Sequence, residues 1–187
     1  REEGPQCVPT TEEEVRALGG VLCLAKLGHV LDPFAGTGGI TSACRKRGML
    51  TYWNDINTSY EAQSHEDATQ PGFYRRVMRD EPIEVVITSP PFHVLDVVLP
   101  LIVAFMPARA LVHVPGHYVT DAHDRRVRFF RALAKEGRLE VFMGLLAGPM
   151  GRRCLWLCIS KTRRLSECLA LRAEVQRESV ETVLLHL

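Results

Sequence analysis

The pattern of apolar and polar positions divides the chain into short apolar runs and longer segments with helical spacing. Six runs are typical of strands, because they are short, often rich in β-branched residues, and bounded by turn residues. The predicted strands cover residues 29–34, 50–56, 84–88, 110–114, 139–146 and 154–160. The run 84–88 consists almost wholly of β-branched residues, which favours a central strand that is covered on both faces.

Apolar residues at helical spacing between these runs predict helices. The predicted helices cover residues 11–27, 40–46, a short segment that ends near 68, 94–106, 124–135 and 166–187. Thr11 and Glu14 have the spacing of a capping box, and residues 70–72 are predicted to form a turn. Strands that alternate with helices and end in a hairpin predict a doubly wound α/β sheet with one antiparallel edge strand.

The first predicted strand is followed by a glycine-rich loop, F-A-G-T-G-G, at residues 34–39. Glycines let the backbone approach a ligand closely, since no Cβ intrudes. The loop lacks the Gly-Lys-Ser/Thr of a phosphate-binding loop and the G-x-G-x-x-G spacing of a dinucleotide site. The carboxylate of Asp32 at the strand end suits a cationic amino group, which favours S-adenosylmethionine among the ligands that such loops bind.

The predicted strand 84–88 ends in a second unusual turn, S-P-P-F, at residues 89–92. Each proline lacks an N–H and fixes φ, so the backbone leaves the sheet rigidly with its carbonyls exposed. Acceptors fixed around the hydrogens of a reacting amine would stabilise the charge that develops on its nitrogen. Candidate acceptors are the Ser89 hydroxyl and the Pro90 carbonyl, and Phe92 is a candidate stacking surface for a planar group. We expect both turns to meet in one crevice at the carboxyl ends of neighbouring strands.

Together these stretches resemble the S-adenosylmethionine-dependent amino-methyltransferases that act on exocyclic amines of DNA or RNA bases. The sequence D-P-F-A-G-T-G at residues 32–38 matches their cofactor motif nearly letter for letter, and S-P-P-F matches their catalytic motif. The resemblance covers about residues 8–92 and is only architectural from there to Lys161. It implies a Rossmann-like, doubly wound, mostly parallel seven-stranded sheet. It also implies S-adenosyl-L-methionine as the cofactor and methyl transfer to adenine N6 or cytosine N4.

The resemblance further implies roles for individual residues. Asp32 and the glycine loop would hold the methionine end, Asp55 the ribose hydroxyls and Asp67 the adenine amine. The implied cofactor contacts are Thr10, Asp32, Phe34, Ala35, Gly36, Gly38, Asp55, Ile56 and Asp67. The implied catalytic residues are Ser89, Pro90, Pro91 and Phe92. A serine after a threonine at this motif is associated with cytosine-N4 enzymes. For Asp55 the structural alternative is a helix N-cap.

The formal net charge of +1 is uninformative, but its distribution is uneven. Residues 125–164 carry eleven basic and two acidic side chains, whereas residues 1–70 carry six basic and ten acidic ones. The basic block predicts contact with nucleic acid, DNA or RNA, and fits a solvated surface equally well. Relatives that recognise DNA sequences carry an added recognition domain, for which this chain has no room. We therefore expect specificity from a protein partner, a missing domain, or a small or single-stranded target.

Two other functions fit the same pattern. One is methyl transfer to the glutamine amide of a protein, which is another planar amide. The other is a catalytically silent subunit that keeps the fold to bind nucleic acid or a partner. The presence of Asp32, the glycine loop, Asp55 and S-P-P-F together disfavours the silent subunit, which has no chemical need for all four.

The length of 187 residues, with 46% apolar and 24% charged residues, is typical of one globular domain. We expect a methyltransferase domain over 1–164 and a C-terminal helix over 165–187 that belongs to this domain or contacts a partner. No apolar run has the length of a membrane helix and no signal peptide is visible, so we expect an intracellular location, cytoplasmic or nuclear. The six cysteines are predicted to be buried thiols.

No metal site is expected. His113, His117 and His123 lack zinc-like spacing and are predicted to be loop or core residues. His93, next to Phe92, is the histidine expected near the substrate.

Overall fold

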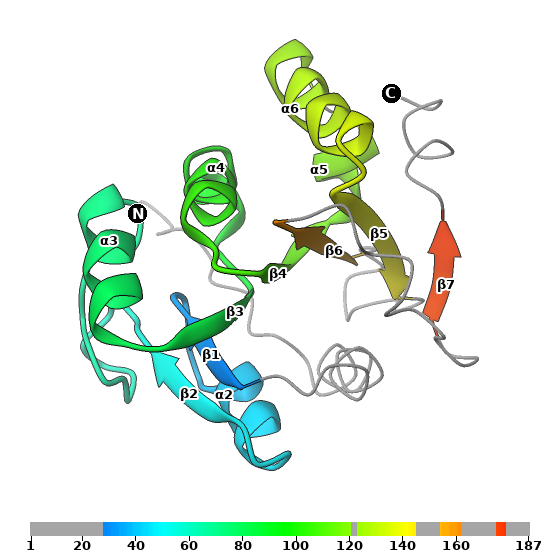
Figure 1. Ribbon diagram of the computed structural model, residues 1–187. Coiled ribbons are helices and arrows are strands. Elements are labelled where there is room, and N and C mark those ends of the chain that lie inside the picture. The colour runs from blue at the N-terminus through cyan, green and yellow to red at the C-terminus, as the bar shows by residue number, and fades with distance from the viewer. Residues whose placement is uncertain (1–27, 121–122, 145–153, 162–174, 179–187) are drawn as a thin grey trace, which may run out of the picture.

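The computed structural model describes residues 28–120, 123–144, 154–161 and 175–178. The strands in this part of the chain are β1 (His29–Asp32), β2 (Leu50–Trp53), β3 (Ile83–Thr88), β4 (Arg109–Pro115), β5 (Leu139–Gly144), β6 (Cys154–Ser160) and β7 (Val175–Glu178). They form one sheet in the order β2-β1-β3-β4-β6-β5-β7 (Figure 1). The pairs β1·β2, β1·β3 and β3·β4 are parallel, while β6 runs antiparallel to both β4 and β5.

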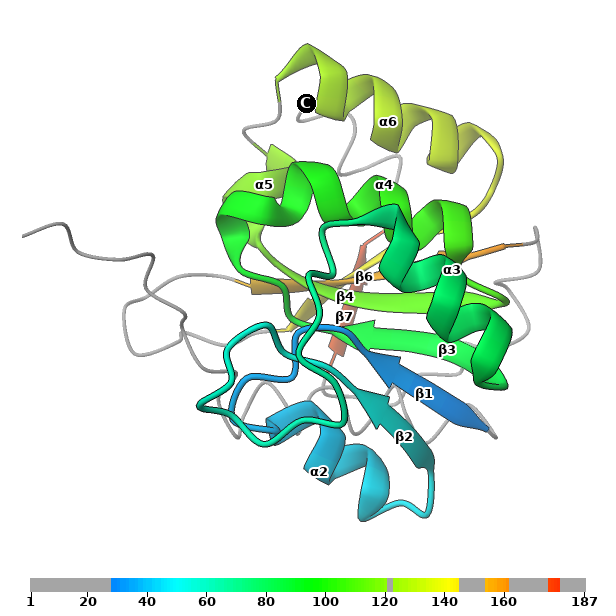
Figure 2. The ribbon, with the colours of Figure 1, turned by 90° about the vertical axis from the view of Figure 1, so that its left-hand side faces the viewer.

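Helices cover both faces of this sheet. The helices are α2 (Gly39–Arg45), α3 (Pro71–Asp80), α4 (Leu95–Phe105), α5 (Gly116–Thr120) and α6 (Asp124–Lys135), with a 3-10 turn η1 (Phe92–Val94) before α4. Figure 2 shows α2 on one side of the strands and α3, α4 and α6 on the other. The predicted doubly wound α/β class is therefore confirmed.

The central strand β3 has its side chains in two separate apolar clusters. Val86 belongs to the larger cluster, which includes Leu99 of α4 and Phe130 of α6. Val85 and Ile87 point to the other face and belong to the cluster that contains Ile40 of α2. All three β3 side chains are buried, as the continuous apolar run predicted.

The region between β2 and β3 differs from the prediction. The sequence predicted a short helix that ends near residue 68 and then a turn at 70–72, but the helix begins at Pro71 and runs to Asp80. Pro71 occupies the first helical turn, where its fixed φ fits the helix and its missing N–H costs no hydrogen bond. Phe73, Tyr74 and Val77 then form the buried face of α3. The turn residues therefore mark the start of a helix.

The C-terminal part of the sheet also differs. The predicted hairpin of β5 and β6 is confirmed, but the antiparallel strand β6 lies inside the sheet, between β4 and β5. The predicted helix over 166–187 is wrong for residues 175–178, which form β7 and pair antiparallel with β5. The rest of that predicted helix lies outside the described residues, as does the one predicted over 11–27.

Among the described residues, no helix is long and apolar enough to cross a membrane.

Replacement by phenylalanine is expected to change the stability in opposite directions at two buried tyrosines. Tyr74 is fully buried, and its hydroxyl has no hydrogen-bond partner within the described part of the chain. The hydroxyl of Tyr118 in α5 donates to Asp96 Oδ1 of α4 at 2.8 Å. We expect Tyr74→Phe to raise the free energy of unfolding by about 1 kcal/mol, because it removes an unsatisfied buried group. We expect Tyr118→Phe to lower it by about 1 kcal/mol, because it removes a bond to a partly exposed carboxylate. Urea unfolding of both variants measures these changes. A change in the same direction in both variants would contradict the difference between the two hydroxyl environments.

Candidate functional site at the ends of β1 and β3

The glycine loop and the S-P-P-F turn leave the sheet at the same edge. β1 and β3 are parallel neighbours, with Val30 paired to Val85 and Leu31 to Val86. Their last residues are Asp32 and Thr88, and the Thr88 hydroxyl donates to Asp32 Oδ1 at 2.9 Å. Because the two turns begin at the next residues, this hydrogen bond fixes their starting points relative to each other.

Asp32 is fully buried and lies beneath the glycine loop. Its carboxylate also accepts a hydrogen bond from the Thr41 hydroxyl of α2 and from the backbone N–H of Phe34, both at 3.4 Å. Burial raises the pKa of Asp32 from 3.8 to about 7, although the hydrogen bonds from Thr88, Phe34 and Thr41 act in the opposite direction. The carboxylate thus joins β1, β3 and α2, and does not project into open space. Its predicted contact with a methionine amino group stays a prediction.

The loop itself requires glycine at two positions. Gly36 has φ +51° and Gly38 has φ +80°, a region that other residues rarely adopt. A Cβ added at either position would meet nothing within 4 Å, so this backbone surface is open to a ligand. The loop is closed by a hydrogen bond from the Gly38 N–H to the Ala35 carbonyl at 2.8 Å.

Asp55 lies directly against this loop. Its Oδ2 accepts the Gly36 N–H at 2.7 Å, and its Oδ1 accepts the Asn57 N–H at 2.9 Å. A carboxylate has about four lone-pair sites, so Asp55 retains capacity for further donors such as ribose hydroxyls. The next residue, Ile56, is 61% exposed and offers an apolar surface beside the carboxylate. The helix N-cap alternative is excluded, since no described helix begins at this position.

A buried asparagine that the sequence reasoning missed holds the segment around Asp55. The Asn54 amide donates to the carbonyls of Pro33 at 3.1 Å and Glu66 at 2.9 Å. Its Oδ1 accepts the Ser64 hydroxyl at 2.7 Å and the Glu66 N–H at 2.9 Å. This side chain therefore joins the end of β1 to residues 64–66. Only the position of Asn54 directly before Asp55 pointed to it in the sequence.

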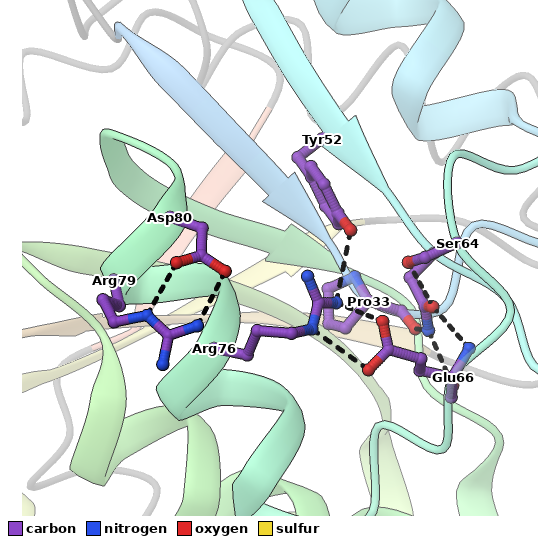
Figure 3. A network of polar contacts seen from close by, with 8 residues as sticks. Pro33, Tyr52, Ser64, Glu66, Arg76, Arg79 and Asp80 are labelled. Carbon is purple, nitrogen blue, oxygen red and sulfur yellow. Dashed lines mark hydrogen bonds and ion pairs between the residues drawn. The ribbon is translucent and has the colours of Figure 1, made fainter.

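Arg76 of α3 fixes the same segment from the other side. Its guanidinium forms an ion pair with Glu66 and donates to the Tyr52 hydroxyl of β2 at 3.3 Å (Figure 3). An irregular segment with few apolar contacts is thereby attached to both a helix and a strand.

Asp67 lies in a local turn before α3. Its Oδ1 accepts the N–H and the hydroxyl of Thr69, at 2.9 and 2.6 Å. These bonds lower the pKa of Asp67 below 3.8. The geometry gives Asp67 a role in the turn, and its contact with adenine stays a prediction. Thr10 lies outside the described residues.

In the S-P-P-F turn, the Ser89 side chain contacts a histidine that was predicted to be a loop or core residue. Ser89 Oγ lies 3.1 Å from Nδ1 of His113 on β4. Pro90 is buried, Pro91 precedes the η1 turn, and Phe92 is partly buried against the larger apolar cluster. Phe34 of the glycine loop packs on the same cluster. His93, predicted to be the histidine near the substrate, is exposed.

Two cavities are lined mainly by described residues of the loops and helices that follow the strands. One, of about 470 Å³, borders the glycine loop on its α2 side, and Ser89 and Phe92 are not among its lining residues. It is lined by Gly36, Thr37, Gly38, Thr41, Ser42, Arg45, Lys46, Trp53, Ser59, Tyr60 and Glu61. The other, of about 270 Å³, lies between α4, α5 and α6 and is lined by Asp96, Pro100, Tyr118, His123, Arg125, Arg126 and Phe129.

No three His, Cys, Asp or Glu side chains in the described ranges come together as a ligand set for a metal ion.

Comparison with known proteins supports the fold. No family model and no curated protein matches the chain. A putative class I S-adenosylmethionine-dependent methyltransferase from Listeria monocytogenes has a TM-score of 0.60 at 12% identity. That match covers 90% of this chain and 66% of the other, so the chain spans just under two thirds of that protein.

Two further solved structures have the same fold. The O-methyltransferase from Bacillus cereus, in complex with SAH, has a TM-score of 0.56 at 12% identity over 84% of each chain. An rRNA methylase from Streptococcus thermophilus has a TM-score of 0.52 at 12% identity and covers 82% of this chain and 99% of that one. At such identities the likeness shows the fold alone.

The buried carboxyl of Asp32 predicts a pH dependence of stability. Its folded-state pKa of about 7 is above the unfolded value of 3.8. The contribution of Asp32 to the free energy of unfolding is therefore fully present below about pH 4 and is lost as the pH rises through 7. Asp32→Asn removes the ionisation and keeps an oxygen that accepts from Thr88. We expect the free energy of unfolding of D32N, minus that of the wild type, to rise by up to about 4 kcal/mol between about pH 4 and pH 8.

Urea unfolding at several pH values measures this difference, and Asp67→Asn is the matched control. The pKa of Asp67 is lowered, so its contribution changes only below about pH 4 and the corresponding difference stays flat over the same range. A flat difference for D32N as well would contradict the raised pKa.

Proposed function

We propose that this protein transfers a methyl group from S-adenosyl-L-methionine to the exocyclic amino group of a base, adenine N6 or cytosine N4, in DNA or RNA. The observation that carries the proposal is the hydrogen bond between Thr88 and Asp32. It brings a glycine loop suited to a cofactor and a rigid turn with amine acceptors to one edge of a methyltransferase-like sheet. Neither motif alone would be specific, because strand ends use glycine and proline freely.

The residues present fit the cofactor. Gly36 and Gly38 offer open backbone surface, and Asp55 at 2.7 Å from the Gly36 N–H has acceptor sites left for the ribose hydroxyls. The exposed Ile56 side chain offers an apolar surface for the adenine ring. When bound, the cofactor supplies a methyl group on a positively charged sulfur. Asp32 supports the glycine loop, because its carboxylate links the start of the loop to β3 through Thr88 and to α2 through Thr41.

The S-P-P-F turn acts on the acceptor. Ser89 Oγ and the Pro90 carbonyl accept the two amine hydrogens, and so favour the tetrahedral nitrogen over the planar one. Both acceptors are fixed before the reaction, so they stabilise the developing positive charge without reorganisation. The face of Phe92 stacks on the target base, which has to leave a duplex to reach it.

The nucleic acid lies over α6 and the cavity between α4, α5 and α6. In that cavity Arg126 is already paired with Asp96, at 2.8 Å, and lies over the Tyr118 ring at 3.8 Å. The neighbouring Arg125 is exposed and is left to meet a phosphate of the substrate. α4 lines this cavity through Asp96 and begins directly after the S-P-P-F and η1 turns, which supports a place for the target base beside the cavity.

Replacement of Ser89-Pro90 by Ala-Ala tests the proposal. We expect methyl transfer to be lost while the calorimetric affinity for S-adenosylmethionine stays nearly unchanged, because the acceptors contact the substrate amine and not the cofactor. The activity is measured by mass spectrometry of nucleosides after DNA and RNA pools are incubated with labelled cofactor. Loss of cofactor affinity and activity together would mean that the turn is structural.

The same experiment on the wild type separates the other functions. If label is found on protein glutamine and not on nucleosides, the substrate is a glutamine amide and not a base. No cofactor binding at millimolar concentration would favour a silent subunit.

Two arginines of α6 test the place of the substrate. Arg125 lines the cavity and Arg128 does not, although both are exposed and lie on the same helix. We expect Arg125→Gln to weaken nucleic-acid binding and to reduce the slope of log K against log salt concentration by about 1, since one phosphate contact is lost. Arg128→Gln is expected to leave the slope unchanged. Equal effects would indicate diffuse attraction by α6 and no defined phosphate contact.

A further inference from the structure

We propose that His113 is a positioning residue, which turns the hydroxyl hydrogen of Ser89 away from the substrate amine. This inference rests on the proposed function, since it concerns how Ser89 becomes an acceptor. No local pattern in the sequence indicated this role, because His113 is 24 positions from Ser89 and lies in a different strand.

Neighbouring strands bring the two side chains together. β3 and β4 are parallel, and Thr88 is paired with Val112, so Ser89 and His113 each follow a paired residue. The ring of His113 is 4% exposed and lies 4.8 Å from the ring of Trp156, its partner on β6. The imidazole is therefore held between two strands, with Nδ1 at 3.1 Å from Ser89 Oγ.

The chemistry of a hydroxyl gives this contact a consequence. A serine hydroxyl has one hydrogen to donate and two lone pairs that accept. If its hydrogen is donated to Nδ1, both lone pairs are free to accept the N–H of a base amine. This arrangement requires the neutral imidazole with its proton on Nε2.

The opposite arrangement would leave Ser89 a poorer acceptor. With the proton on Nδ1, the ring would donate to Ser89 Oγ and occupy a lone pair. The serine hydrogen would then be free to point at the amine, which needs an acceptor. A histidine whose Nδ1 accepts thus makes Ser89 an acceptor before the substrate arrives, in the manner of a preorganised site.

Three substitutions of His113 separate positioning from packing. His113→Asn places an amide oxygen near the Nδ1 position, His113→Gln places its amide near the Nε2 position, and His113→Leu fills similar space with no acceptor. We expect kcat to fall on the order of 10- to 100-fold in H113L and H113Q and to be largely kept in H113N, with the cofactor KM unchanged in all three. The melting temperature of each variant is measured as well. Loss of activity in H113N equal to that in H113L, or in proportion to lost stability, would overturn the proposal.

A double-mutant cycle with Ser89→Ala links the two residues. If His113 acts only through Ser89, the double variant S89A/H113L is no slower than S89A alone. Independent, multiplying losses would overturn the proposal.

The tautomer is tested without activity. Nitrogen NMR of the wild type labelled at histidine should show Nδ1 unprotonated and Nε2 protonated in the resting protein, with the Nδ1 signal shifted in S89A. The reverse tautomer would overturn the positioning role even if methyl transfer is found. A different result would be the expected tautomer together with no methyl transfer to any base. In that case the hydrogen bond between His113 and Ser89 would stand, and the proposed function would be wrong.

Discussion

The site depends on one buried hydrogen bond, from the Thr88 hydroxyl to the Asp32 carboxylate. Both side chains are fully buried, and each is the last residue of its strand. A carboxylate in such a place is costly, and the pKa of Asp32 is raised to about 7 as a result. A hydrogen bond to a charged group contributes about 1.5–3 kcal/mol, so three donors around Asp32 offset part of that cost. The same contacts fix the starting points of the glycine loop and the S-P-P-F turn.

Further from the sheet, hydrogen bonds and ion pairs of polar side chains hold the chain in place, as apolar packing does in the core. The segment between Asn54 and Asp67 contains no helix and no named strand. Asn54 uses its amide hydrogens and its oxygen in four hydrogen bonds, and Arg76 ties Glu66 to α3. A fully satisfied network of this kind gives an irregular segment a single position. Asp55 thereby reaches the glycine loop without a helix behind it.

The fold by itself does not select a substrate. The similar structures include an O-methyltransferase and an rRNA methylase, so the acceptor must be argued from the site. Beside the S-P-P-F turn, this chain has the pair formed by Ser89 and His113. It also has a cavity in which Arg126 pairs with Asp96 and Arg125 is exposed. These features lie on the helices and strands that follow β3, whereas the cofactor motif lies before it.

Sequence patterns alone predicted the alternation of strands and helices, the central position of residues 84–88, and the two turns at neighbouring strand ends. These follow from local rules, since apolar periodicity, glycine and proline act on the residues next to them. The sequence did not show that Pro71 begins a helix, because proline occurs both in turns and in the first turn of a helix. It also missed β7, because strand pairing at residues 175–178 depends on a β5 edge more than thirty positions away.

Which polar side chains meet is set by the packing of distant parts of the chain. Asp32, whose contact with a ligand stays a prediction, is buried and accepts hydrogen bonds from Thr88 and Thr41. His113 is a core residue, as predicted, and its contact with Ser89 was not predicted. Hydrogen bonds between side chains 24 and 56 positions apart are set by strand order and register, and no local pattern encodes these.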